Sequence, residues 1–171
     1  ASAYASSGRT YIMWNYLRLA DLYLYYAEAA NRAWGPTAAP QGIIGFSLTA
    51  VDAINKVRNR AGMPGFNPAS PHAWLKPGTV DEFEQKIRNE IRIETCFEEK
   101  RFYDLRRWHM MTDPKIATMY GMYIEKTGPE NFTYNVVPVG FNLQWKEFHH
   151  LFKIKNSDTE LGPNFEQNPG W

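Results

Sequence analysis

Residues 79–98, TVDEFEQKIRNEIRIETCFE, constrain the fold of this chain more than any other stretch, because they have the period of an α-helix. Their apolar residues predict one buried face, formed by Phe83, Ile87 and Ile91. Thr79 followed by Glu82 predicts a capping box at the start of the helix. Glu90 and Glu94 fall within the same apolar arc, so the helix brings two carboxylates to a buried surface, one turn apart.

Two buried carboxylates need partners, because a buried charge without one is costly. One interpretation is a carboxylate pair for acid–base chemistry, as in glycosidases. The interpretation that we favour is a structural network of ion pairs, since the planar guanidinium group of arginine suits bidentate pairing with a carboxylate. Arginines occur nearby in two stretches, as Arg58 and Arg60 and as Arg101, Arg106 and Arg107. We expect the last three to be partners for Glu90, Glu94 and Glu98.

Three further stretches have helical character, residues 16–33, 47–61 and 101–111. Each is closed by glycine or proline, in the sequences WGP, GMP and TDP respectively. Ser47 is the expected N-cap of the second stretch. The first two stretches are joined by a loop rich in proline and glycine, which predicts an αα-hairpin.

The block EEKRFYDLRRWHM at residues 98–110 interleaves cations with aromatic rings, a mixture that can grip nucleic acid or tie a helical core together. Its apolar residues recur every three positions and predict packing against the core, by Phe102, Leu105 and Trp108. Asp104 and Arg107 have the spacing of an ion pair within the helix. The chain has 19 Lys and Arg against 18 Asp and Glu, so it lacks the excess of cations that nucleic-acid binding requires.

Beyond residue 114 the composition changes. MYGMYIEK and NFTYNVVPVG, on either side of a turn at residues 127–130, predict a short β-hairpin. The tail from Leu151 to Trp171 is rich in turn residues, and we expect it to be extended and to dock onto the helices. The expected fold is therefore mainly α, with helix pairs, a small β-hairpin and an extended C-terminal tail.

Composition limits the remaining possibilities. The 171 residues are enough for one domain with a sizeable core. Cys96 is the single cysteine, so no internal disulfide forms, and we expect a small buried thiol rather than a nucleophile. No apolar run approaches the roughly 20 residues that span a bilayer. The start, ASAYASSGRTYIMW, does not have the pattern of a signal peptide, so either the protein is unprocessed or a targeting segment is missing from the chain.

Few residues point to a ligand. Glu147 and His150 form one Glu-x-x-His spacing, whereas a carboxylate-bridged di-iron site needs two, so we expect no metal and no cofactor. Rings of tryptophan in loops are candidates for packing against the apolar faces of sugars, or alternatively anchor the loops. These candidates are Trp34, Trp74 and Trp145.

Four separated motifs resemble the C-terminal region of the SusD/RagB family. They are RLADLYLYYAEAANRA, AINKVRNRAGMP, FEQKIRNEIRIETCFEEKRFYDLRRW and the terminal QNPGW, in this order. The resemblance extends from Arg18 to Trp171. The family tail often reads FPIP, where this chain has Phe152-Lys153-Ile154-Lys155, so the lysines put its rigid extended geometry in question.

The resemblance implies a scaffold of tetratricopeptide-like helix pairs in an outer-membrane nutrient-binding lipoprotein of Bacteroidetes. Family members lie on the extracellular face of the outer membrane, held by a lipid anchor on an N-terminal cysteine, and serve polysaccharide utilization. They bind glycans, or peptides in some RagB-like members, and deliver them to a SusC-like TonB-dependent transporter. They do not catalyse a reaction. Family members are several times longer, so residues 1–171 are expected to be a C-terminal fragment that lacks the anchor.

Two other classes stay open. The helix pairs alone could act as a protein–protein scaffold in the same complex. A hydrolase would use Glu90 and Glu94, which requires both carboxylates to reach solvent in a cleft.

Overall fold

The computed structural model describes residues 16–42, 44–162 and 164–171. The N-terminal stretch that was considered as a signal peptide lies outside these residues. The chain forms two compact units, Ala1–Cys96 and Phe97–Trp171, and each is described by itself. The expectation of a mainly helical fold with one small hairpin is confirmed. Among the described residues, no helix combines the length and the apolar character needed to cross a bilayer.

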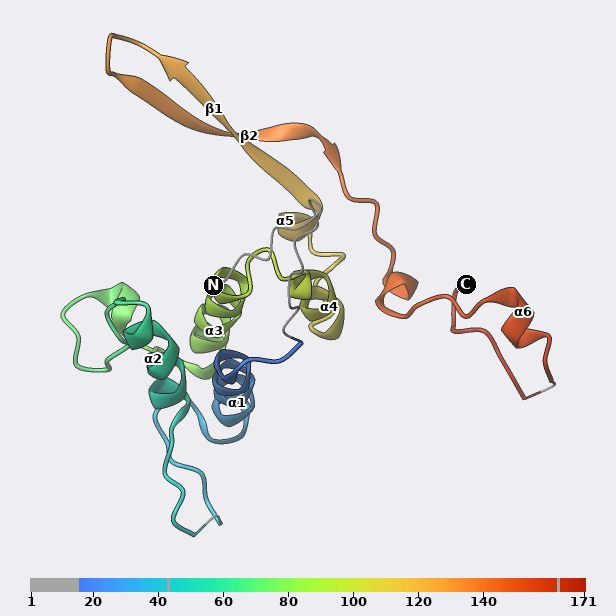
Figure 1. Cartoon of the computed structure of the whole chain (residues 1–171), viewed down its shortest axis with the longest axis horizontal. Helices are drawn as coiled ribbons and strands as arrows, with labels where there is room; N and C mark the ends of the chain where they lie inside the picture. Colours follow the sequence, from blue (N-terminus) through green and yellow to red (C-terminus); the bar gives the residue numbers. More distant parts are fainter. Residues whose placement is uncertain (1–15, 43, 163) are drawn as a thin grey trace, which may run out of the picture. The chain divides into compact units, whose positions relative to one another are not determined.

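In the described part of the first unit there are three α-helices and one short 3-10 helix. The α-helices are α1 (Leu19–Trp34), α2 (Ala50–Arg60) and α3 (Val80–Glu94), and η1 (Ala73–Leu75) lies in the loop between α2 and α3. Helix α1 packs against both α2 and α3, as Figure 1 shows. This arrangement agrees with the helix pair predicted for the first two helices.

The core of the first unit lies where α1, α2 and α3 meet. The apolar face predicted for α3 is confirmed, since Phe83, Ile87 and Ile91 are all buried. Small residues of α1, Ala27 and Ala30, are also buried and allow the helices to approach closely. Leu17 and Leu19, at the start of the first predicted helix, are exposed.

Capping residues set the limits of these helices. The capping box of Thr79 and Glu82 is present at the start of α3, as predicted. Helix α2 is capped by Thr49 rather than by Ser47, because the Thr49 side chain accepts a hydrogen bond from the Asp52 N–H. Helix α3 ends at Glu94 rather than at residue 98, since Phe97 has a φ of 65° that no α-helix accommodates.

The second unit combines short helices with a β-hairpin. It begins with α4 (Lys100–Arg107) and α5 (Pro114–Ala117), and the hairpin strands are β1 (Thr118–Lys126) and β2 (Phe132–Asn142). The strands are antiparallel, with Lys126 opposite Phe132 beside the turn. The sequence therefore predicted the hairpin correctly.

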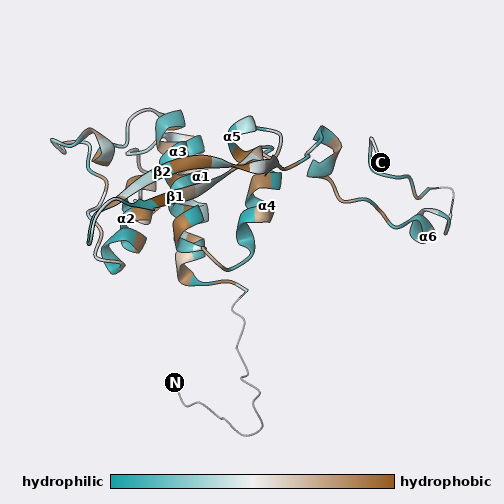
Figure 2. Cartoon of the chain, turned by 90° about the horizontal axis from the view of Figure 1, so that it is seen from above, coloured by the Kyte–Doolittle hydropathy of each residue, from teal (hydrophilic) through white to brown (hydrophobic). Residues whose placement is uncertain are grey.

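Many apolar side chains of the hairpin are exposed, and hydrophobic colour runs along both strands in Figure 2. They come from both faces of the ribbon and include Tyr120, Met122, Tyr123, Ile124, Tyr134 and Val136. A two-stranded ribbon cannot bury both of its own faces.

Helix α4 differs from its prediction. The Asp104–Arg107 ion pair is confirmed, with 3.1 Å between Nε and Oδ1. Phe102, however, is exposed, and the buried residues of the helix are Asp104 and Arg106. The Arg106 guanidinium lies 3.7 Å from the centroid of the Phe152 ring, so a cation–π contact takes the place of the expected apolar packing.

After the hairpin, the described residues include η2 (Glu147–His150) before the tail and α6 (Asn156–Thr159) within it, and the sequence predicted neither helix. Between them, the backbone is extended at both ends of the FKIK segment. The Gln167 side chain accepts a hydrogen bond from the Ile154 N–H and donates one to its carbonyl, each at 2.8 Å. Asn168 donates to the Phe152 carbonyl. The terminal QNPGW motif therefore holds the FKIK segment in an extended conformation. The two lysines of this segment had put that geometry in question.

Cys96 is exposed, so the expectation of a buried thiol is wrong. It lies just after the end of α3.

Candidate functional site

A groove with a cavity volume of about 620 Å³ lies in the first unit, beside α3. Its apolar walls include the Trp74 ring of η1, which is 56% exposed. Amide and ammonium groups of α3 line the same groove, from Gln85, Lys86 and Asn89. Its volume falls in the usual range of small-molecule sites, and it combines one large ring with several hydrogen-bonding groups.

The floor of the groove is an ion pair buried beneath an aromatic ring. Arg58 Nη1 of α2 donates to Glu90 Oε2 of α3 at 2.6 Å, and Arg58 Nε donates to the Pro64 carbonyl at 2.9 Å. The same guanidinium lies 4.4 Å from the centroid of the Phe66 ring. Both charged side chains are about nine-tenths buried, so this part of the groove is fixed by its own contacts.

A second clamp fixes the loop that carries Phe66. The Asn55 side chain accepts a hydrogen bond from the Phe66 N–H at 2.7 Å and donates one to its carbonyl at 2.9 Å. Gly65 lies so close to this amide that a Cβ atom there would lie 2.9 Å from Asn55 Cγ. Phe66 also packs edge-on against Phe83 of the core, with 5.4 Å between ring centroids. The groove is therefore largely pre-formed.

The carboxylate of Glu82 lies at the rim of the groove. Its Oε2 accepts a hydrogen bond from the Thr79 N–H at 2.7 Å. This bond to the charged form holds the pKa of Glu82 below its ordinary value. The group is thus an ionised cap of α3.

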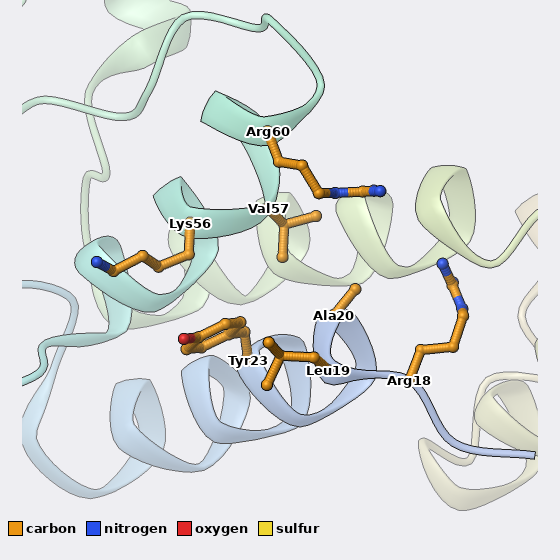
Figure 3. Close-up of a pocket in the computed structure, with 7 residues that line it drawn as sticks. All are labelled: Arg18, Leu19, Ala20, Tyr23, Lys56, Val57 and Arg60. Atoms are coloured by element: carbon orange, nitrogen blue, oxygen red, sulfur yellow. The ribbon is translucent and has the colours of Figure 1, made fainter.

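Glu94 is shared by two arginines of the other helices. Arg60 Nη2 donates to Glu94 Oε1 at 2.7 Å, and Arg18 Nη1 donates to the same oxygen at 2.9 Å. Figure 3 shows both arginines extending toward α3, one from α2 and one from the start of α1. A smaller cavity of about 230 Å³ lies between α1 and α2 beside them, with Leu19, Tyr23 and Val57 among its lining residues.

The predicted partners of Glu90 and Glu94 are corrected by these contacts. Both carboxylates take their arginines from the first unit, because packing of α1 and α2 onto α3 brings those guanidinium groups to the carboxylates. The arginines that the sequence had assigned to them have other contacts. Arg106 lies on aromatic rings, Arg107 pairs with Asp104, and Arg101 lies 5.8 Å from the Trp108 ring centroid. Glu98 pairs with Lys100 at 3.2 Å.

A third buried carboxylate, Glu84, was missed from the sequence. Its side chain is 1% exposed and accepts a hydrogen bond from Arg88 Nε at 2.9 Å. Arg32 of α1 lies 3.3 Å away through its Nε. Glu84 lies at the edge of the apolar face of α3, on the side that packs against α1. This position was the only feature of the sequence that could have predicted its burial.

These contacts contradict the geometry that a hydrolase needs. A catalytic carboxylate pair must reach solvent and substrate. Glu90 and Glu94 instead lie largely buried, and each is bonded to arginine. Their arrangement stabilises the packing of three helices.

The two other tryptophan candidates lie apart from the groove lining. Trp34 is the last residue of α1 and is half-buried, although the sequence had placed it in a loop. Trp145, in the second unit, is half-buried and packs against Phe102 and His149. Of the three, Trp74 has the most exposed ring and borders the larger groove.

Comparison with known proteins gives a consistent result. A family model described as the SusD family matches residues 1–171. Among solved structures, a SusD-like protein from Bacteroides fragilis NCTC 9343 is 26% identical with a TM-score of 0.66, and the match covers 98% of this chain and 28% of that one. A protein designated BT4246 is 27% identical with a TM-score of 0.68, and the match covers 97% of this chain and 25% of that one. No curated protein matches the chain.

The chain therefore spans about a quarter of the length of the solved structures that it matches. The family model, in contrast, matches it from the first residue to the last. The chain belongs to the SusD family.

Proposed function

We propose that the protein captures glycans at the cell surface and delivers them to a SusC-like TonB-dependent transporter. Membership of the SusD family supports a nutrient-binding role at the outer membrane. The proposed location is the extracellular face of that membrane, in a longer lipid-anchored protein of which these residues are the C-terminal region. The quarter-length match to SusD-like structures supports the last point.

The groove beside Trp74 is the observation that carries the proposal. A sugar ring has an apolar face of C–H groups and an edge of hydroxyls, so it needs an exposed aromatic surface next to hydrogen-bonding side chains. Trp74 supplies the surface, and the amides of Gln85 and Asn89 supply donors and acceptors in the same groove. The fixed floor beneath them lowers the entropy that binding would otherwise cost.

The protein is proposed to bind its ligand without chemical change. Glu90, which lines the groove, is bonded to Arg58. Glu94 is engaged by two arginines. Neither is positioned to give or take a proton from a bound sugar.

Calorimetric titration tests the proposal. A panel of soluble oligosaccharides and a set of short peptides is titrated into the 171-residue chain and into the full-length protein that contains it. A saccharide is expected to bind, and Trp74→Ala is expected to weaken that binding about tenfold or more, since loss of a central aromatic contact costs more than 1 kcal/mol. Trp145→Ala is the matched control, because it truncates a tryptophan of the second unit, and it should leave the affinity unchanged.

Other outcomes of the titration would support a different function or contradict the proposed site. Binding of peptides but not of saccharides would make the protein a peptide-binding member. If no saccharide binds and the full-length protein still associates with its transporter, the helix pairs act as a scaffold. Equal loss of binding in Trp74→Ala and Trp145→Ala would contradict the groove as the site.

A further inference from the structure

Three potential metal ligands meet in the second unit. His109 follows the C-terminal end of α4, and Glu147 and His150 are the first and last residues of η2. One ligand atom from each side chain lies within 4.8 Å of the others. The cluster is separate from the groove of the first unit in its residues and its chemistry.

His150 is the unusual member of this cluster. Its side chain is only 4% exposed, yet neither ring nitrogen has a hydrogen-bond partner within the part of the chain that the structure describes. A buried polar atom without a partner is rare in proteins, because it loses its bonds to water and gains nothing in exchange. Such an atom calls for an explanation, and a bound ion is one.

The distances leave room for an ion between the side chains. Each oxygen of the Glu147 carboxylate lies near a different histidine. Oε1 is 3.8 Å from His109 Nδ1, and Oε2 is 3.7 Å from His150 Nε2. Both distances exceed a hydrogen bond. Ligand atoms about 2.0–2.1 Å from a tetrahedral zinc ion lie about 3.4 Å from one another, so small rotations of exposed side chains would complete the site.

The two histidines also face each other, with 4.4 Å between ring centroids. His109 has a φ of 53°, a left-handed conformation that residues other than glycine seldom adopt. This turn ends α4 and carries the His109 ring to the cluster. His109 and Glu147 are both exposed, so an ion has access from solvent.

The donor set selects the class of ion. Two imidazoles and one carboxylate suit Zn²⁺, which takes three protein ligands and leaves a further position for water. Ca²⁺ and Mg²⁺ prefer sites made of oxygen atoms. We propose that His109, Glu147 and His150 form a Zn²⁺ site that ties the end of α4 to the η2 segment of the tail.

The sequence did not point to this site. It contains one Glu-x-x-His spacing, and the third ligand lies far upstream, on the other side of the hairpin. Only the fold of the second unit, where α4 and η2 are in contact, brings His109 to the other two residues.

Zinc titration in competition with a chromogenic chelator tests the proposal on the 171-residue chain. One Zn²⁺ per chain is expected to bind, and Co²⁺ at the same site should give the visible absorption of a tetrahedral complex. His109→Ala and Glu147→Gln should each weaken Zn²⁺ binding about tenfold or more. Both residues are exposed, so these variants should fold even if a change of the buried His150 does not.

Two matched histidine variants serve as controls. His72→Ala removes an exposed histidine of the first unit. His149→Ala removes the residue next to His150; the Nδ1 atom of His149 accepts a hydrogen bond from the Lys146 N–H. Both should keep the affinity for Zn²⁺, and Ca²⁺ should not displace the ion. The proposal is overturned if the chain binds no Zn²⁺ at one equivalent. It is also overturned if His149→Ala or His72→Ala weakens binding as much as His109→Ala does, because the ion is then held by surface histidines in general.

Discussion

The two units of the chain differ in how far they bury their own side chains. In the first unit, the buried carboxylates of Glu84, Glu90 and Glu94 all have arginine partners from a second helix or from the next turn. In the second unit, the buried side chain of His150 has no hydrogen-bond partner within the described part of the chain, and many apolar side chains of the hairpin face solvent. The first unit therefore encloses an apolar core with paired carboxylates at its edge, whereas the second contains features that a ligand or a further surface would satisfy.

The difference follows from the elements themselves. Three helices that pack around Phe83 and Ile87 enclose an apolar core and can pair charges at its edge. A two-stranded hairpin has no such interior. The tail of the second unit depends instead on side-chain amides, such as those of Gln167 and Asn168, which bond to its backbone.

Matched truncations of an aromatic residue in each unit should give the largest contrast. Phe83→Ala should lower the free energy of unfolding by about 3–5 kcal/mol, because it leaves a cavity in a fully enclosed core. Tyr134→Ala, on the exposed hairpin, should change it by about 0.5 kcal/mol or less. Urea denaturation followed by circular dichroism measures both. Similar losses for the two variants would remove the contrast between the units.

Breaking the ion pair beneath the groove should have the next largest effect. Glu90→Ala should cost about 3 kcal/mol, since it strands the buried guanidinium of Arg58. The double variant Glu90→Leu with Arg58→Met should recover much of that loss, because it removes both charges. If the double variant is as unstable as the single one in urea denaturation, the stranded charge is not the cause.

Glu94→Ala should have a smaller effect, about 1.5 kcal/mol, because Arg60 is mostly exposed and regains water when its partner is lost. In a chain of this size, the loss corresponds to a fall of roughly 5 °C in Tm. Stability should fall before any affinity for ligand is lost. A thermal melt unchanged by this substitution would contradict the role of Glu94 in joining three helices.

The smallest effect should be a dependence on pH at the cap of α3. The pKa of Glu82 is lower in the folded chain than in the unfolded one, because the Thr79 N–H bonds to its ionised form. Its contribution to stability is thus present above the unfolded pKa and is lost as the pH falls through the folded pKa. Urea denaturation across this acid range should show a steeper loss for the native chain than for Glu82→Gln. Parallel curves would mean that the cap does not depend on charge.

The sequence predicted what depends on local patterns. The period of Phe83, Ile87 and Ile91 identified the buried face of α3, and the two stretches on either side of a turn identified the hairpin. It did not predict which arginine reaches which carboxylate, because that choice depends on the packing of α1 and α2 onto α3. Arg58, Arg60 and the arginines of α4 are equivalent in charge, and only the three-dimensional arrangement distinguishes them.

The candidate sites depended even more on the fold. Trp74 could be named from the sequence, but the groove beside it forms only when its loop lies against α3. The histidine cluster could not be found, since His109 is distant in the chain from Glu147 and His150. In both cases the sequence identifies the type of each residue, but it does not show which of these residues lie close together in the folded chain.

Hydrogen exchange measured by mass spectrometry on the intact, ligand-free chain tests the central contrast most directly. The account predicts slow exchange for the amides of α1, α2 and α3, which open only when the core of the first unit opens. It predicts exchange faster by orders of magnitude in β1 and β2, whose side chains lack a covered face. Equal protection of the hairpin and of α3 would contradict this expectation, because the hairpin would then open no more readily than the enclosed core of the first unit.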